Sequence, residues 1–328
     1  MSGLALGLVF DCQEDYLAQG FSPEDVAEFD PRATVEGIAQ GLAACGHRVH
    51  LVGSGRDLAK ALAQGGRFDL VFNIAEGVSG FSREAQVPAL CELYGQRYTF
   101  SDPLTSALTL HKAMAKRVVR DAGLPTAPFV VVEGGELPAA LPFPPPYFAK
   151  PVAEGSSKGI GAASLATDTE TLAEVCRNLA HRFRQPVLVE PYLSGREVTV
   201  GIVGNGQKAR VVGVMEVVFT EKAEAAAYTA TNKKEYEERV RYRLVDREAL
   251  GQKAAAAALG CYRLLGLRDA ARIDLRCDAS GEPQFLEANP LPGLDPVRSD
   301  LPIMARLAGW RYEQLLAAIV EAAWERGW

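Results

Sequence analysis

Residues 1–102 alternate between strand-like and helix-like segments, and this alternation is the strongest constraint on the fold. The strand-like segments are short apolar runs: residues 4–10, 49–52 and 69–74. The segments between and after them carry apolar residues at helical spacing: residues 34–44, 58–63 and 84–94. A β-α-β alternation predicts a parallel sheet covered by helices on both faces. Such sheets bind ligands at the carboxyl ends of their strands, so residues 11–30 and 75–83 are candidate binding loops.

Composition narrows the class of protein further. A chain of 328 residues exceeds one comfortable hydrophobic core, which predicts two or three domains. A hydrophobic content of 48% and a charged content of 23% exclude a mainly disordered, collagen-like or coiled-coil chain. The net charge of −6 argues against a general nucleic-acid binder. The sequence contains no apolar run of about 18 residues, so no membrane span is expected, and residues 1–10 indicate a first strand rather than a signal peptide.

Cysteine and histidine positions give no sign of a metal site. The cysteines form no CxxC pair and are predicted to be buried free thiols, which favours a reducing cytoplasm: Cys12, Cys45, Cys91, Cys176, Cys261 and Cys277. The histidines show no ligand spacing and are expected on the surface or in packing: His47, His50, His111 and His181.

The remaining sequence predicts a small α+β module followed by long antiparallel strands. The module is expected to contain one helix, a proline-rich connector, a second helix and short strands: residues 103–122, 137–146, 170–182, 129–132, 147–149, 160–165 and 187–190. Later strands and helices are expected at residues 197–203, 210–219, 247–265, 272–277, 284–287 and 312–328. Residues 220–241 are polar and charged, which is typical of a solvated loop.

The last two predicted strands form a hairpin with polar groups on one face. Arg272 and Asp274 share a face because side chains alternate along a strand, and Glu287 and Asn289 do the same. Gly281 lies where the connecting turn needs a glycine. Two carboxylates and an amide carbonyl are hard oxygen ligands suited to Mg²⁺, which would offset the charge of a polyphosphate. The alternative is a solvent-facing polar side of a hairpin.

A second motif begins at Lys150, at the end of a predicted strand. It is followed by a glycine- and serine-rich loop, residues 154–161, whose backbone N–H groups could hold phosphate oxygens. The lysine precedes the glycines, so this is not a Walker A loop, and a simple hairpin turn is the alternative.

A third motif surrounds two acidic residues at strand ends. Glu190 ends one apolar strand and Glu197 begins another. A carboxylate at a strand end can bind an adenine amino group or ribose hydroxyls, whereas the alternative is a surface turn with two exposed acids.

These motifs, in this order, resemble the ATP-grasp superfamily, specifically D-alanine–D-alanine ligases and related ligases. The resemblance extends from about residue 103 to residue 328 and includes residues 110–116 and 122–125. It implies an α/β and α+β chain with a Rossmann-like N-terminal parallel sheet and an antiparallel C-terminal sheet. The implied domains are an N-terminal domain (1–102), a central ATP-grasp subdomain (103–186) and a C-terminal ATP-grasp domain with the metal site (187–328).

The resemblance also implies roles for residues around the nucleotide. ATP would lie between the second and third domains, contacted by residues that include one on a mobile loop of uncertain register: Lys112, Lys150, Ser156, Ser157, Glu190, Leu193, Glu197 and Lys233. Asp274, Glu287 and Asn289 would ligate two Mg²⁺ ions, with Mn²⁺ as an alternative metal. Arg272, Lys233, Ser156 and Glu28 would be the catalytic residues, with Arg272 stabilising the transferred phosphate.

The sequence departs from the family in the loops that face the substrates. The family's N-terminal Gly-Gly-x-Ser-x-Glu segment is absent, and Glu28 is the expected replacement for the acid that binds the substrate ammonium; Asp30 competes, with a helix N-cap role as its alternative. The family's His-Gly-x-x-Gly-Glu-Asp-Gly loop is also missing, and its place is taken by residues 73–86. Candidates for the substrate site are Asn73, Glu76, Gly293, Arg298 and Ser299; Arg83 and Glu84 are further polar candidates, with surface or helix-cap roles as the alternative.

The resemblance therefore implies an ATP-dependent, ADP-forming carboxylate–amine ligase that works through an acyl phosphate. Its partners would be small amino acids or amines, with no nucleic acid and no membrane, and dimers are common among such ligases. The divergent loops leave open whether the substrates are two D-alanines or include a different amino acid or amine. A nucleotide-binding protein without ligase activity, or a kinase that stops at phosphoryl transfer, would be a different class of protein.

Overall fold

The computed structural model describes residues 3–220 and 240–326. Its first sheet is parallel, as the alternation predicts, with strand order β2-β1-β3. Its strands are β1 (Ala5–Val9), β2 (Arg48–Gly53) and β3 (Leu70–Asn73). The helices of this region are α1 (Gln13–Ala18), α2 (Arg32–Ala44), α3 (Gly55–Ala63), the 3₁₀ helix η1 (Arg83–Ala85) and α4 (Gln86–Leu93).

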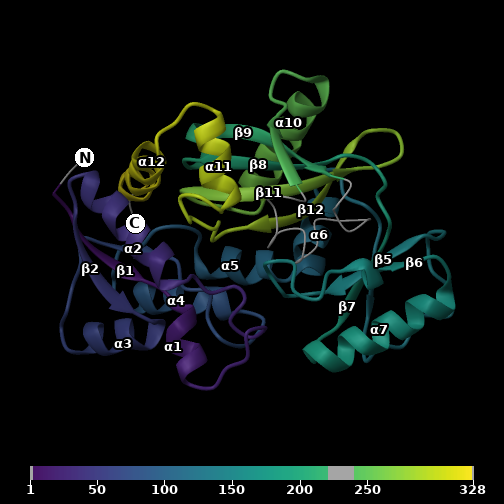
Figure 1. The fold of residues 1–328 in the computed structure, drawn as a ribbon, viewed down its shortest axis with the longest axis horizontal. Helices are drawn as coiled ribbons and strands as arrows, with labels where there is room; N and C mark the ends of the chain where they lie inside the picture. Colours follow the sequence, from purple (N-terminus) through teal and green to yellow (C-terminus); the bar gives the residue numbers. More distant parts are fainter. Residues whose placement is uncertain (1–2, 221–239, 327–328) are drawn as a thin grey trace.

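A four-stranded antiparallel sheet, in the order β4-β7-β5-β6, forms the second layer of the molecule, on the right of Figure 1. Its strands are β4 (Val130–Val132), β5 (Tyr147–Pro151), β6 (Leu165–Ala166) and β7 (Val187–Pro191). Helix α7 (Thr169–Phe183) packs against β5 and shares a core with this sheet. Because β7 pairs with both β4 and β5, the expected domain boundary at residue 186 falls inside this sheet.

A five-stranded antiparallel sheet, in the order β10-β9-β8-β11-β12, lies between the other two. Its strands are β8 (Glu197–Val203), β9 (Arg210–Phe219), β10 (Val240–Leu244), β11 (Ala270–Cys277) and β12 (Pro283–Asn289). One face packs against α10 (Ala249–Leu264) and against α6 (Lys112–Asp121), which follows α5 (Pro103–Leu110). The α/β and α+β fold with parallel and antiparallel sheets is therefore confirmed.

The C-terminal helices return to the first sheet. Helix α11 (Asp300–Leu307) contacts β8 and β9, and α12 (Tyr312–Glu325) packs against α2. Figure 1 shows α12 beside α2. These contacts form one hydrophobic core shared by the first and last parts of the chain.

Several predicted elements differ in the structure. The helix predicted over residues 103–122 is broken at His111, whose Nδ1 accepts a hydrogen bond from Met114 N (3.3 Å) and caps α6. Most of the segment predicted as a strand over residues 160–165 is not a strand: its middle is the 3₁₀ helix η2 (Ala162–Ser164), and β6 begins only at Leu165. Helix α2 begins at Arg32 with Pro31 as its N-cap, so Asp30 is not the N-cap. Helices α1 and α11 and strand β10 were not predicted.

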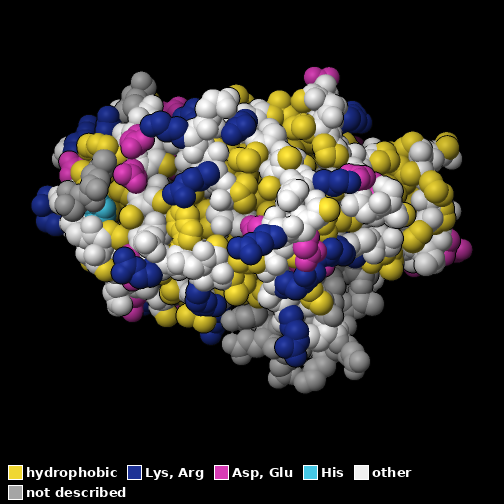
Figure 2. Space-filling model, turned by 90° about the horizontal axis from the view of Figure 1, so that it is seen from above, with side chains coloured by type: hydrophobic (Ala, Val, Ile, Leu, Met, Phe, Trp, Pro, Cys, Tyr) yellow, Lys and Arg dark blue, Asp and Glu magenta, His cyan; other side chains and the backbone are white. Residues whose placement is uncertain are grey.

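The distribution of basic side chains and the state of the cysteines can be compared with what the composition predicts. On the face drawn in Figure 2, the coloured Lys and Arg side chains are separated by apolar and acidic ones and form no continuous basic stripe. All six cysteines are free, and five of them are buried, as expected. Among the described residues, none of the helices combines the length and the apolar character that crossing a bilayer requires.

Candidate active site

The hairpin of β11 and β12 carries the predicted polar face. Arg272 pairs with Asn289 and Asp274 with Glu287 in the antiparallel register, so the four side chains lie on one side of the sheet. Arg272 Nε and Nη2 donate to the two oxygens of Asp274, both at 2.9 Å, and Asn289 Nδ2 donates to Asp274 Oδ2 at 3.1 Å. Arg272 Nη1 also contacts Asp300 Oδ2 at 3.0 Å. Although burial disfavours the charged guanidinium, Asp274 and Asp300 raise the pKa of Arg272, which therefore stays cationic.

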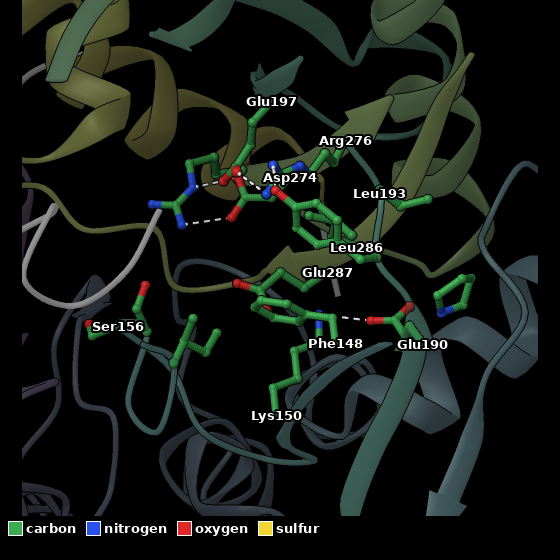
Figure 3. Close-up of a pocket in the computed structure, with 15 residues that line it drawn as sticks. Phe148, Lys150, Ser156, Glu190, Leu193, Glu197, Asp274, Arg276, Leu286 and Glu287 are labelled. Atoms are coloured by element: carbon green, nitrogen blue, oxygen red, sulfur yellow. Dashed lines mark hydrogen bonds and ion pairs between the residues drawn. The ribbon is translucent and has the colours of Figure 1, made fainter. Parts of the chain in front are cut away.

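A cavity, here called the first cavity, lies between this hairpin and the four-stranded sheet. Phe148, Lys150 and Glu190 face Glu197, Asp274 and Arg276 across it (Figure 3). The remaining described residues that line it are Ser156, Ser157, Ile160, Pro191, Tyr192, Leu193, Arg272, Leu286 and Glu287.

One end of the first cavity has the chemistry of a site for a flat heteroaromatic ring. The rings of Phe148 and Tyr192 have centroids 6.3 Å apart, and the Arg276 guanidinium lies 4.9 Å from the Tyr192 ring centroid. Leu193 and Leu286 complete the apolar lining. Apolar walls with a few fixed polar groups are typical of small-molecule sites.

The lysine at the end of β5 is held in a buried ion-pair cluster. Glu190 Oε1 contacts Lys116 Nζ at 2.6 Å, and Glu190 Oε2 contacts Lys150 Nζ at 3.2 Å. Burial disfavours ionisation of Glu190, but the two lysines outweigh it and hold the pKa of that carboxyl below its usual value. Burial likewise opposes the charge on Lys150, yet Glu190 and Glu287 raise its pKa. This cluster therefore presents a fixed positive charge to the cavity.

Glu197 lies opposite, with Arg276 Nη1 at 3.3 Å from its Oε2. Burial raises the pKa of Glu197 to about 7, although Arg276 favours its ionised form. The carboxylate is thus partly protonated near neutral pH and can accept or donate a hydrogen bond.

The glycine- and serine-rich loop after β5 is strained and is tied to the N-terminal region. Ser156 and Ser157 have φ values of 46° and 58°, in the left-handed region that favours glycine. Glu28 Oε1 accepts a hydrogen bond from Gly155 N (3.2 Å), and Glu28 Oε2 contacts Arg83 Nη2 at 2.6 Å. Burial opposes the charge on Glu28, but Arg83 and Lys158 lower its pKa to about 2. Non-glycine residues in this backbone region persist where their surroundings hold them, and such strain is common at functional sites.

A second cavity adjoins the first, and Ser156 and Arg272 line both. Most of its other lining residues come from the two divergent loops and from the segment after β12, joined by Phe100, Gly155 of the glycine- and serine-rich loop, and Asn289 at the end of β12. The full set is Ala27, Glu28, Phe29, Asp30, Ile74, Glu76, Glu84, Phe100, Gly155, Asn289, Pro290, Leu291, Pro292, Gly293, Leu294, Arg298, Ser299 and Asp300. A group bound in one cavity can therefore meet a group bound in the other beside Arg272.

The structure brings most of the predicted site residues to these cavities. Glu28, Glu76, Gly293, Arg298 and Ser299 line the second cavity. Asn73 does not: it is fully buried, and its Oδ1 accepts a hydrogen bond from Ala75 N.

The remaining predictions concern Lys112, Arg83, Glu84 and Lys233. Lys112 is absent from the described lining of the first cavity; its Nζ contacts Glu287 Oε2 (3.2 Å) and the Glu154 carbonyl. Arg83 and Glu84 are buried rather than on the surface. Lys233, predicted to reach the γ-phosphate, lies outside the described residues.

Sequence reasoning missed residues that complete the first cavity. Arg276 lies on the same face of β11 as Arg272 and Asp274, so period-two alternation could have identified it. Lys116, one helical turn after Lys112, contacts Glu190. Tyr192 had no distinguishing local pattern.

Two antiparallel sheets that enclose an oxygen- and lysine-lined cavity, next to a parallel-sheet region, define an ATP-grasp fold. The family model "D-ala D-ala ligase C-terminus" matches residues 118–321. A D-alanine–D-alanine ligase of Sinorhizobium fredii is 33% identical over 312 residues, which cover 94% of this chain and 96% of the relative. The chain belongs to the D-alanine–D-alanine ligase family.

A further relative and a solved structure are also similar to this chain. An uncharacterized protein of Sinorhizobium fredii, y4sG, is 32% identical over 89% of this chain and 87% of its own length. A Bacillus anthracis D-alanine–D-alanine ligase, solved as a complex with ATP, superimposes with a TM-score of 0.77 at 20% identity and covers 99% of this chain and 98% of that one. The last comparison supports the fold.

Proposed function

We propose that this protein is an ATP-dependent, ADP-forming ligase that joins a carboxylate to an amine through an acyl phosphate. The observation that carries the proposal is the junction of the two cavities at Arg272 and Ser156. A nucleotide in the first cavity would present its terminal phosphate where a carboxylate in the second cavity could receive it. Family membership and the ATP-grasp fold support the same assignment.

The nucleotide end is assigned to the first cavity. Phe148, Tyr192, Leu193 and Leu286, which line this cavity, would form the slot for the adenine ring, and Glu197 would bind the ribose hydroxyls. Lys150 supplies positive charge for the phosphates, and the N–H groups of the loop around Ser156 can hold phosphate oxygens. Lys112 and Lys233 remain predicted phosphate contacts.

The hairpin provides a donor set that fits Mg²⁺. Asp274, Glu287 and Asn289 combine two carboxylates with an amide carbonyl, which are the oxygen ligands this ion prefers, and Asn289 lies within hydrogen-bond distance of Asp274. A bound divalent ion would neutralise phosphate charge and polarise the phosphoryl group. Two Mg²⁺ ions, with Mn²⁺ as an alternative, remain the prediction.

The reaction follows from the poor leaving group of a carboxylate. Transfer of the terminal phosphate to a carboxylate oxygen releases ADP and forms an acyl phosphate. The amine then attacks the carbonyl carbon, the bond to the phosphate oxygen breaks, and an amide and inorganic phosphate form. Arg272 stabilises the charge that develops on the transferred phosphate and on the tetrahedral intermediate, because a guanidinium fixed in place before the reaction needs no reorganisation.

The test is a substrate panel with ATP and Mg²⁺, in which ADP is quantified and condensed products are identified by mass spectrometry. Amide formation with ADP release in equal amounts is the expected result. ADP release without any amide, across the panel, would instead identify a kinase or an ATPase. D-Alanine alone is one member of the panel, and turnover with it would give the product named for the relatives.

A second candidate differs in the amine or amino acid joined. It is favoured by the divergence of the two loops that line the second cavity, where Glu28 pairs with Arg83 instead of remaining available to a substrate ammonium.

The compartment and the oligomeric state are separate proposals. Free thiols favour a reducing compartment, and we place the reaction in the cytoplasm. A homodimer would be tested by light scattering.

A further inference from the structure

Three carboxylates line the second cavity without a described basic partner. We call Asp30, Glu76 and Glu84 the acidic wall. Asp30 precedes α2, Glu76 follows β3, and Glu84 lies in η1, so three separate segments bring acids to one cavity. Among the described residues, none of the three side chains has an ion pair within 4.0 Å. Like charges held close together are unfavourable unless a cation joins them.

Glu84 shows that the acidic wall is more than a solvated surface. The side chain is only 6% exposed, and its Oε2 is buried without a hydrogen-bond partner among the described residues. A buried carboxylate oxygen without a partner destabilises the folded protein, so this oxygen is expected to gain a donor from a bound molecule. Glu84 lines the second cavity, where such a donor would be placed.

Other acids of the same cavity already have partners. Glu28 is held by Arg83, Lys158 and Gly155 N, and Asp300 by Arg272. The basic side chains in the described lining of this cavity are Arg272, which is paired, and Arg298, which is exposed. The described lining therefore has more acidic than basic side chains. Burial raises the pKa of Asp30 and Glu84 to about 7 and that of Glu76 well above its usual value, so a bound cation would favour their ionised forms.

A metal ion does not account for the acidic wall. Within the described residues, no three His, Cys, Asp or Glu side chains lie close enough together to hold one ion. A protonated amine fits better, because its three N–H donors can reach carboxylates that are spread along a wall.

We propose that the amine substrate carries a second protonated amino group, and that the acidic wall binds this group. The proposal rests on the proposed function, since it names the class of amine that the ligase would use. The reacting amine would lie near Arg272 and Ser156, and the second ammonium would lie between Glu76 and Glu84. A diamine and an amino acid with a basic side chain share this chemistry, and Arg298 could bind the carboxylate that only the amino acid has.

The test compares matched amines that differ in one terminal amino group. Isothermal titration of the full chain, with Mg²⁺ and a non-hydrolysable ATP analogue, would measure dissociation constants for 1,4-diaminobutane against butylamine and for ornithine against norvaline. A charge-assisted hydrogen bond to the acidic wall predicts at least about tenfold tighter binding of the amine with the extra amino group. Equal constants within both pairs would overturn the proposal.

Variants locate the effect. Glu84→Gln and Glu76→Gln keep the side-chain length and remove the charge, so each should reduce the preference about tenfold or more. Glu174→Gln, on the exposed face of α7, is the matched control and should keep the preference. Circular dichroism would show that each variant is folded; two independent acidic-wall variants keep the test decisive if one fails to fold. An unchanged preference in a folded acidic-wall variant would overturn the proposal.

Two further outcomes separate the sources and the hypotheses. If the substrate is a basic amino acid, Arg298→Ala should weaken binding of ornithine but not of 1,4-diaminobutane. If the wild-type protein binds 1,4-diaminobutane more tightly than ornithine, the substrate is a diamine. Amide formation with neutral amines, combined with equal affinity within both pairs, would refute the acidic-wall proposal while leaving the ligase assignment intact. A clear preference for the amines with the extra amino group, without any amide formation, would support the acidic-wall proposal and refute the ligase assignment.

Discussion

The two cavities differ in how their charges are arranged. In the first cavity each acid at the ion-pair clusters has a basic partner: Glu190 has Lys116 and Lys150, Glu197 has Arg276, and Asp274 has Arg272. In the second cavity, the acidic wall has none among the described residues. The first arrangement fixes side chains in the cavity to which we assign the nucleotide. The second leaves carboxyl groups that the proposed substrate ammonium would pair with, and most of them lie in the loops that diverge from the family.

The largest effect is expected from Glu287→Gln, which removes a predicted metal ligand of the first cavity. ADP release should fall by about 10²–10³-fold, because a fixed electrostatic contribution to phosphoryl transfer is lost. Steady-state ADP release would measure it. Glu282→Gln, in the exposed turn of the same hairpin, is the control and should retain activity. Wild-type turnover in Glu287→Gln would contradict the metal assignment.

Lys116→Met tests whether the paired charges of the first cavity stabilise the fold. Lys116 is fully buried, and its removal leaves Glu190 with one lysine, so the free energy of unfolding should fall by about 3 kcal/mol. Urea denaturation would measure the loss. Lys253→Met removes an exposed ion pair with Glu282 and should change stability by less than about 1 kcal/mol. Equal effects of the two variants would show that burial of the pair is unimportant.

Glu84→Gln should have the opposite sign, because it removes an unpaired buried charge. Burial raises the pKa of Glu84 to about 7, above its ordinary value of 4.5. The wild-type protein therefore loses stability as pH rises from about 4.5 to about 7, whereas the variant does not. The variant should match the wild type at pH 4 and exceed it by up to about 3 kcal/mol at pH 8, because each unit of pKa shift corresponds to about 1.4 kcal/mol. Urea denaturation at both pH values checks this. A variant that is less stable than the wild type at pH 8 would show that the Glu84 carboxylate has a stabilising partner.

Glu28→Gln is expected to have the smallest effect and distinguishes two roles for that residue. If Glu28 mainly holds Gly155 N and Arg83, the KM for ATP should rise about threefold to tenfold, since the loop at Ser156 loses an anchor worth about 1 kcal/mol. If it binds the substrate ammonium, as the sequence predicted, the KM for the amine should rise instead. Initial-rate measurements with each substrate varied separate the two results.

The sequence predicted the first cavity better than the second for a physical reason. Period-two alternation places Arg272 and Asp274 on one face of a strand, and antiparallel pairing then brings Glu287 and Asn289 beside them. These relations are local. Period-two alternation along β11 also places Arg276 on this face, so the same pattern could have identified it from the sequence.

The second cavity depends on contacts between segments far apart in sequence. Glu28 meets Arg83 and Gly155 only after three segments have packed together, and no local pattern encodes that meeting. The left-handed conformation of Ser156 and Ser157 is similarly imposed by the surroundings. Asn73 is a substrate-site candidate from the sequence because it stands where the family's histidine loop is missing, yet its side chain is buried and its Oδ1 accepts a hydrogen bond from Ala75 N.

Oxygen-isotope transfer tests the central claim, the coupling of the two cavities through an acyl phosphate, most directly. An ¹⁸O-labelled carboxylate substrate would be turned over with ATP and amine, and the released inorganic phosphate analysed by mass spectrometry. Each released phosphate should carry one labelled oxygen, because the carboxylate oxygen leaves with the phosphate when the amine attacks. Unlabelled phosphate, accompanied by ADP, would show that water takes the phosphoryl group and that no acyl phosphate forms.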